Sequence, residues 1–169
     1  MKIGLISDTH SWIHPRLFDF FENCDEIWHA GDIGNIETAD ELNSFRPLRA
    51  VYGNCDDTKV RQAYGKNLRF KVDGVEVFIT HIGGTIGYYE PDIRQELSEN
   101  PPDLFVCGHS HVALVQYDDK YKFLHINPGA AGYTGPHKIM TAIRFNIEGK
   151  QITDLELIEL GERGKVKLS

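Results

Sequence analysis

The sequence predicts an α/β protein, and two observations carry this prediction. Over the first third of the chain, apolar runs alternate with segments of helical pattern, which is typical of a parallel sheet covered by helices. After residue 54 the pattern changes, because Asp73-Gly74 between two strand-like runs is a strong hairpin signal. Antiparallel strands therefore enter there, in a second sheet or a mixed one.

Three buried strands and two helices are expected in the amino-terminal third. The first strand is the apolar run that ends at Asp8, and the next two cover residues 26–30 and 48–52. Pro15 suits the first turn of a helix that should end near residue 23. A second helix at residues 37–45 is stopped by Pro47.

Most of the remaining chain reads as a β meander. Its expected strands are residues 68–72, 75–80, 104–107, 113–117, 122–126, 139–147 and 151–160. A glycine-rich loop at residues 83–89 carries two tyrosines that we expect to be exposed, Tyr88 and Tyr89, and a short helix follows at residues 91–100. Residues 162–169 are polar and are expected to form a mobile tail. We expect one domain over residues 1–169, without a linker or an internal repeat.

Composition narrows the classes of partner. Eighteen basic residues against 25 acidic ones give a net charge of −7, which argues against binding nucleic acid or a membrane through bulk positive charge. Three cysteines, with no C-x-x-C pair, indicate neither a disulfide framework nor a zinc ribbon. With no targeting segment and no apolar run near the roughly 20 residues of a membrane span, we expect a cytoplasmic protein. Homo-oligomerisation stays open.

Five of the predicted strands are each followed by a side chain that can bind a metal. These endings draw only on Asp, His and Asn, and three are introduced by glycine: Asp8 and His10, Gly31-Asp32, Gly53-Asn54, His81, and Gly108-His109 with His111. In open α/β sheets ligands bind at the carboxyl ends of strands. Alternation along an extended segment would place Asp8 and His10 on one side and Thr9 on the other. Oxygen and nitrogen donors aimed at one point suggest a metal.

The series Asp8-x-His10, Gly31-Asp32, Gly53-Asn54, His81 and Gly108-His109-x-His111 resembles the motifs of the calcineurin-like metallophosphoesterases. The resemblance implies a four-layer α/β/β/α sandwich, two mixed sheets flanked by helices, with a two-metal site between the sheet edges. Length and Cys55 are most similar to the small single-domain phosphodiesterase branch. The phosphoesterase-fold subunit of the retromer coat is related to that branch.

The resemblance also implies a ligand set. Asp8, His10 and His111 would bind one metal, whereas Asn54, His81 and His109 would bind the other, and Asp32 would bridge them. The expected cofactor is two divalent ions per chain: Mn first, with Fe, Zn, Co and Ni suitable, because four imidazoles favour borderline metals and Mg prefers oxygen. The expected function is hydrolysis of a small-molecule phosphoester, a diester in preference, by in-line attack of a hydroxide that bridges the metals.

One catalytic position departs from the family. Alongside Asp32 and Asn54, many members have a His that protonates the leaving group or holds phosphate, where this chain has Cys55. Cys55 is either a small apolar filler or a thiol that loses its proton beside the cations. Relatives also commonly have a further Gly and His after the histidine that corresponds to His81, where this chain has Ile82-Gly83-Gly84.

Other residues have simpler interpretations. His29 and His125 are expected to be packed or surface histidines, and His14 and His137 solvated loop residues, although His137 follows a loop that resembles one near the family site. Trp12, Tyr88 and Tyr89 are candidates for a stacking wall. The alternative function is a metal-binding interaction scaffold with weak or no turnover, which Cys55 favours and the intact ligand set disfavours. A nucleic-acid exonuclease is disfavoured by the acidic charge.

Overall fold

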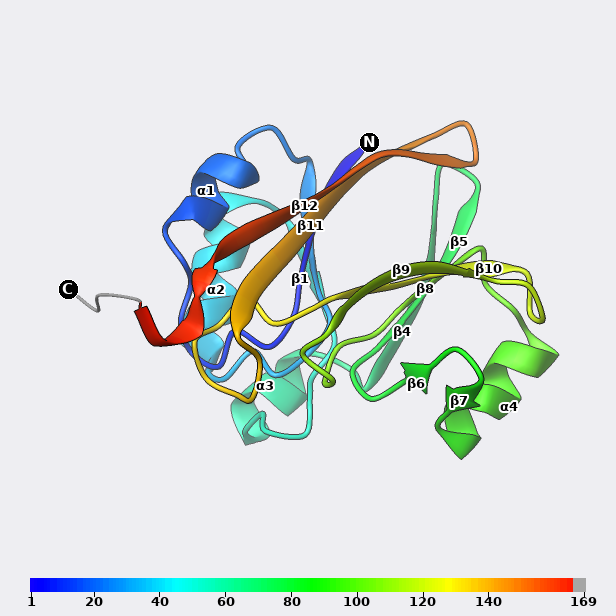
Figure 1. Ribbon diagram of the computed structural model, residues 1–169, viewed down its shortest axis with the longest axis horizontal. Coiled ribbons are helices and arrows are strands. Elements are labelled where there is room, and N and C mark those ends of the chain that lie inside the picture. Colours follow the sequence, from blue (N-terminus) through cyan, green and yellow to red (C-terminus); the bar gives the residue numbers. More distant parts are fainter. Residues whose placement is uncertain (166–169) are drawn as a thin grey trace.

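Two five-stranded mixed sheets face each other in the computed structural model, which describes residues 1–165 (Figure 1). The first sheet has the order β12-β11-β1-β2-β3, and the second has the order β4-β5-β8-β10-β9. The first contains β1 (Lys2–Ile6), β2 (Glu26–His29), β3 (Leu48–Ala50), β11 (Ile139–Glu148) and β12 (Gln151–Glu162). The second contains β4 (Asn67–Val72), β5 (Val75–Thr80), β8 (Leu104–Val106), β9 (Ala113–Asp118) and β10 (Phe123–Pro128).

Parallel pairing joins three neighbouring strands in each sheet. Strands β1, β2 and β3 are parallel, with Leu5 opposite Trp28, and β5, β8 and β10 are parallel in the second sheet. The hairpin signal is confirmed, because Val72 pairs with Val75 across Asp73 and Gly74, and both turn residues have positive φ.

Helices cover the outer face of each sheet and complete four layers (Figure 1). These are α1 (Arg16–Phe20), α2 (Ile36–Phe45), α3 (Thr58–Ala63) and α4 (Pro91–Glu99), and a 3₁₀ turn, η1, covers Arg163–Lys165. Leu17 of α1 and Leu42 of α2 pack in one cluster with Ile27 of β2. Ile93 and Leu97 of α4 pack with aromatic residues of the second sheet. The predicted α/β/β/α sandwich is confirmed.

Strand β5 shows how the core is divided. Val77 and Ile79 point into the cluster between the two sheets, whereas the intervening Phe78 belongs to the cluster under α4. A strand buried on both faces needs apolar residues at successive positions, which explains the continuous apolar runs of the sequence.

Four expectations about local structure were wrong. Helix α3 was not predicted, because its six residues are too few for a periodic pattern. Asp57 is its N-cap, and the Asp57 carboxylate accepts a hydrogen bond from the backbone N–H of Val60 at 3.0 Å. The glycine-rich loop contains a small hairpin, β6 (Gly84–Thr85) and β7 (Tyr88–Tyr89). Tyr88 is exposed as expected, but Tyr89 is buried and its hydroxyl donates to Asp118 at 2.7 Å.

The expected carboxyl-terminal tail is ordered over residues 162–165. Strand β12 continues to Glu162, and Arg163 of η1 donates its backbone N–H to Lys138 and its Nε–H to the carbonyl of His137, both at 2.9 Å. Residues 166–169 of that prediction lie outside the described part of the chain. None of the helices in residues 1–165 is long and apolar enough to cross a membrane.

Candidate metal centre

The seven predicted ligands lie together at a shared edge of the two sheets. The first sheet provides Asp8 and His10 after β1, Asp32 after β2 and Asn54 after β3, while the second provides His81 after β5 and His109 and His111 after β8. All five strands are parallel within their sheets, so their carboxyl ends meet at one edge.

Asp8, His10 and His111 form the first group, with ligand atoms within 4.8 Å of one another. His111 Nε2 lies 2.9 Å from Asp8 Oδ1, and His10 Nε2 lies 3.9 Å from the same oxygen. These are the three residues assigned to one cation from the sequence.

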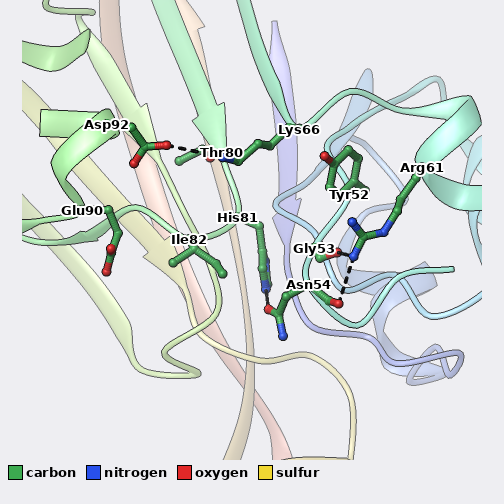
Figure 2. Close-up of a pocket in the computed structure, with 10 residues that line it drawn as sticks. All are labelled: Tyr52, Gly53, Asn54, Arg61, Lys66, Thr80, His81, Ile82, Glu90 and Asp92. Carbon is green, nitrogen blue, oxygen red and sulfur yellow. Dashed lines mark hydrogen bonds and ion pairs between the residues drawn. The ribbon is translucent and has the colours of Figure 1, made fainter. Parts of the chain in front are cut away.

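Asp32, His81 and His109 form the second group, also with ligand atoms within 4.8 Å. His81 Nε2 lies 3.3 Å from Asp32 Oδ2 and 3.1 Å from Asn54 Oδ1, the contact drawn in Figure 2. Asp32 also reaches toward the first group, because its Oδ2 lies 3.9 Å from His10 Nε2. A carboxylate with neighbours on both sides is what a bridging ligand requires.

Two buried polar atoms in this cluster have no hydrogen-bond partner, Asp8 Oδ1 and His10 Nε2. Leaving such atoms unpaired is costly in a protein interior, and the two atoms lie 3.9 Å apart within the first group. A bound cation would satisfy both atoms, so the donor set fits a metal.

Hydrogen bonds prepare two histidines for metal binding. His81 Nδ1 lies 2.7 Å from the Ala30 carbonyl, which can only accept, so Nδ1 carries the proton and Nε2 is free. His137 Nε2 must likewise donate to the Gly132 carbonyl at 2.8 Å, so in neutral His137 Nδ1 accepts from His111 Nδ1 at 3.0 Å. His111 Nε2 is then free to bind a cation.

The carboxylates are held in their charged form. Burial would raise the pKa of Asp8, but the side chain of His111 beside it and the charge of His81 outweigh burial and lower the pKa. Asp32 behaves in the same way, because His81 beside it lowers its pKa despite burial. Burial would lower the pKa of His81, but Asp32 and Asp8 raise it, so negative charge dominates the cluster. This field attracts cations.

Left-handed backbone is concentrated at the candidate ligands. Five of the ten described non-glycine residues with positive φ are Asp8, His10, Asp32, His109 and His111. The reason given above for the convergence of Asp8 and His10 was therefore wrong: β1 ends at Ile6, and a sharp turn, not extended backbone, brings the two side chains together. Thr9 does point away, with its hydroxyl bonded to Ile33 and His29. Backbone strain of this kind is retained at functional sites.

The glycines before three of the ligands leave room for neighbouring site residues. A Cβ on Gly53 would lie 2.1 Å from Asp32 Oδ1, one on Gly31 would lie 2.6 Å from His81 Nδ1, and one on Gly108 would lie 2.0 Å from the Ser7 hydroxyl oxygen. Only glycine permits these approaches without displacing the site.

The sequence profile of the calcineurin-like phosphoesterase superfamily domain matches residues 1–150 of the chain. The chain belongs to this superfamily. A probable metallophosphoesterase of Methanocaldococcus jannaschii is 30% identical over 168 residues, which cover 94% of this chain and 82% of that protein. The predicted family is confirmed.

Solved structures of the superfamily share the fold over nearly the whole chain. An archaeal phosphodiesterase is 24% identical, with a TM-score of 0.73 and coverage of 94% of this chain and 99% of that one. Vps29 of Entamoeba histolytica, in a complex with zinc, is 17% identical, with a TM-score of 0.71 and coverage of 95% and 100%. These likenesses confirm the metallophosphoesterase fold.

Cys55 is exposed, so the interpretation of this residue as a small apolar filler is wrong. Its backbone N–H donates to Asp32 Oδ1 at 2.8 Å, and its sulfur lies within 4.8 Å of ligand atoms of His10 and Asp32. Partial burial, followed by the charge of Asp32, raises the pKa of the thiol. Position 55 of this superfamily member therefore faces the site with a thiol in place of an imidazole.

Four histidines lie outside the predicted ligand set. The sequence left open whether His29 and His125 are packed or lie at the surface, and the structure shows that both are buried. His14 lies outside the metal groups. His137 is not the solvated residue that was expected, because it is half-buried and holds the ring of His111.

Two positioning residues were missed. Asp56 is buried, and its carboxylate accepts hydrogen bonds from the backbone N–H groups of Ile33, Gly34 and Gly53 at 3.2, 2.7 and 2.8 Å. Asp56 thereby joins the loop of Asp32 to the loop of Asn54. Arg61 donates to the carbonyls of Asp56, Gly53 and Asn54, the last at 3.0 Å (Figure 2). An acidic residue next to the Gly-Asn pair was the available signal, but it equally suits a turn or a helix cap.

Proposed function

We propose that the protein is a metal-dependent phosphodiesterase whose site holds two divalent cations. One observation carries the proposal: Asp32 belongs to the second group of donor atoms and its Oδ2 lies 3.9 Å from His10 Nε2 of the first, and the buried atoms Asp8 Oδ1 and His10 Nε2 lack any hydrogen-bond partner. Membership of the superfamily supports phosphoester chemistry.

In this proposal Asp8, His10 and His111 hold one cation, Asn54, His81 and His109 hold the other, and Asp32 bridges the two. Bound there, the cations would supply Lewis-acid charge to the phosphate oxygens and a hydroxide nucleophile at neutral pH. The imidazole-rich donor set suits a first-row transition ion, Mn first among them. The zinc complex of the Vps29 relative supports a transition ion in this fold.

The chain's own residues position these donors and set the charge that the substrate meets. His137 and Ala30 fix the protons of His111 and His81, while Asp56 and Arg61 fix the Asn54 loop. The basic side chains of the cavity beside His81 already have partners: Arg61 binds backbone carbonyls and Lys66 lies 3.4 Å from Asp92 (Figure 2). Lys66 is thereby neutralised by Asp92, so we propose a singly charged diester in preference to a doubly charged monoester. The archaeal phosphodiesterase of the same fold supports the same choice.

Position 55 determines which diesters react well. An imidazole at this position could donate a proton to the leaving group, whereas Cys55 offers a thiol, whose proton would be lost beside bound cations. The enzyme would then favour leaving groups that are stable as anions.

The experiment is removal and restoration of metal. The purified protein is treated with a chelator and then supplied separately with Mn, Zn, Fe, Co and Ni, and hydrolysis of phosphodiesters and monoesters is followed. Diester hydrolysis should stop and return with metal. A protein that binds metal but cleaves no ester with any of the five ions would contradict the proposal and favour the scaffold function.

A further inference from the structure

A second cavity lies beside the candidate metal centre, on the side of His109. Its volume is about 390 Å³, and its lining includes the side chains of Ile82, Tyr88, Val112 and Leu114. Ligand pockets have volumes of roughly 300 to 1,000 Å³ and mostly apolar walls. This apolar cavity has both properties and is large enough for a ring-sized group.

The cavity gathers large apolar side chains that are open to solvent. Tyr88 is 83% exposed, Val112 65% and Ile82 37%, and they come from three different segments, β7 and the residues after β8 and β5. Exposed apolar groups that converge on a concave surface indicate a binding site. The β6–β7 hairpin that carries Tyr88 is anchored to the second sheet. Tyr89 is buried and its hydroxyl donates to Asp118, while the neighbouring Tyr88 is exposed to solvent.

The position of the cavity relates it to the chemistry. His109 lines the apolar cavity, whereas His81 and Asn54 line the polar cavity of Figure 2, and Ile82 and Glu90 line both. His81 and His109 belong to the same metal group with Asp32. A phosphate held at that group would therefore have one ester arm beside each cavity.

We propose that the apolar cavity binds an uncharged aromatic or aliphatic arm of the phosphodiester, and that Tyr88, Val112 and Ile82 determine specificity for that arm. This inference rests on the proposed phosphodiesterase function. The substrate class is then a diester with two unlike arms, one polar and one apolar. None of the three residues is a metal ligand, so they act on substrate binding and not on the metal site.

The test uses diesters that share a p-nitrophenyl leaving group and differ in the second arm, which is methyl, phenyl or naphthyl. Tyr88→Ala should lower kcat/KM about five- to tenfold for the phenyl and naphthyl esters, through KM, and change the methyl ester less than about twofold. Val112→Ser should shift the same two esters in the same direction. Tyr117→Ala is the matched control, since Tyr117 is 51% exposed but lines neither cavity.

Binding of phosphinates separates this inference from the proposed activity. Diphenylphosphinate and dimethylphosphinate carry one negative charge and have no ester bond to cleave, so titration of the metal-loaded protein measures binding alone. The diphenyl compound should bind more tightly, and Tyr88→Ala should remove that preference even if no diester is hydrolysed. Equal binding of the two compounds, or equal loss in Tyr88→Ala and Tyr117→Ala, would overturn the inference.

Discussion

Removal of the Asp56 carboxylate tests whether this buried side chain holds the two loops of the metal centre together. In Asp56→Ala three backbone N–H groups, of Ile33, Gly34 and Gly53, lose their acceptor. An unsatisfied buried donor costs about 1–3 kcal/mol. We expect a loss of about 3 kcal/mol, because Gly34 is half-buried and water can replace one of the bonds. Metal affinity should fall as well, since Asp32 and Asn54 lie on the freed loops.

The assay is urea unfolding together with a metal titration. Asp57→Ala is the matched control: the neighbouring carboxylate caps α3 through the N–H of Val60, so its removal should cost about 1 kcal/mol and leave metal affinity unchanged. Asp56→Asn keeps one acceptor oxygen and should fall between the two. If Asp56→Ala and Asp57→Ala lose equal stability and both retain metal affinity, the positioning role of Asp56 is refuted.

Three further predictions concern steric room, proton transfer and pH. Gly53→Ala should reduce the metal content measured by mass spectrometry, because the new Cβ would lie 2.1 Å from Asp32 Oδ1. Gly164→Ala is the control, since its Cβ would have no atom within 4 Å, and equal metal content in the two variants would contradict this prediction. The rate should fall steeply as the leaving-group pKa rises across aryl and alkyl diesters, and Cys55→His should flatten that slope; a shallow slope in the unmodified enzyme would mean that another residue donates the proton. Burial lowers the pKa of His125 to about 4 from 6.5, so its contribution to stability is complete above pH 6.5 and is lost as pH falls toward 4. Between pH 7 and 5 the loss should reach about 2 kcal/mol in urea unfolding, and His125→Gln should reduce it; an unchanged pH dependence in that variant would refute the assignment.

The convergence of the candidate ligands could be predicted from the sequence because these residues directly follow strand ends. A buried parallel strand is a continuous apolar run, so a polar residue that interrupts it marks the carboxyl end, and Asp8, Asp32 and His81 were found in this way. The four-layer fold could be predicted from the family resemblance together with the change from alternating elements to hairpins.

The supporting residues could not be predicted, because their roles depend on contacts between distant segments. Asp56 and Asp57 are adjacent and chemically identical, yet one joins two loops and the other caps a helix. Tyr88 and Tyr89 are also adjacent and chemically identical, and only contacts with distant residues, Asp118 and the cluster under α4, distinguish the buried Tyr89. His137 lies 26 residues from His111 in the chain, and no local pattern indicates their contact.

The shared carboxylate of Asp32 is the central claim, and the number of metal ions per chain tests it most directly. Metal is measured by mass spectrometry in the unmodified protein, in Asp32→Asn and in the control His14→Ala, together with the rate of diester hydrolysis. We expect two ions per chain in the unmodified protein and in His14→Ala, and at most one ion with no activity in Asp32→Asn, because a neutral amide cannot offset the charge of two cations. An unchanged metal content and rate in Asp32→Asn would contradict the dinuclear site.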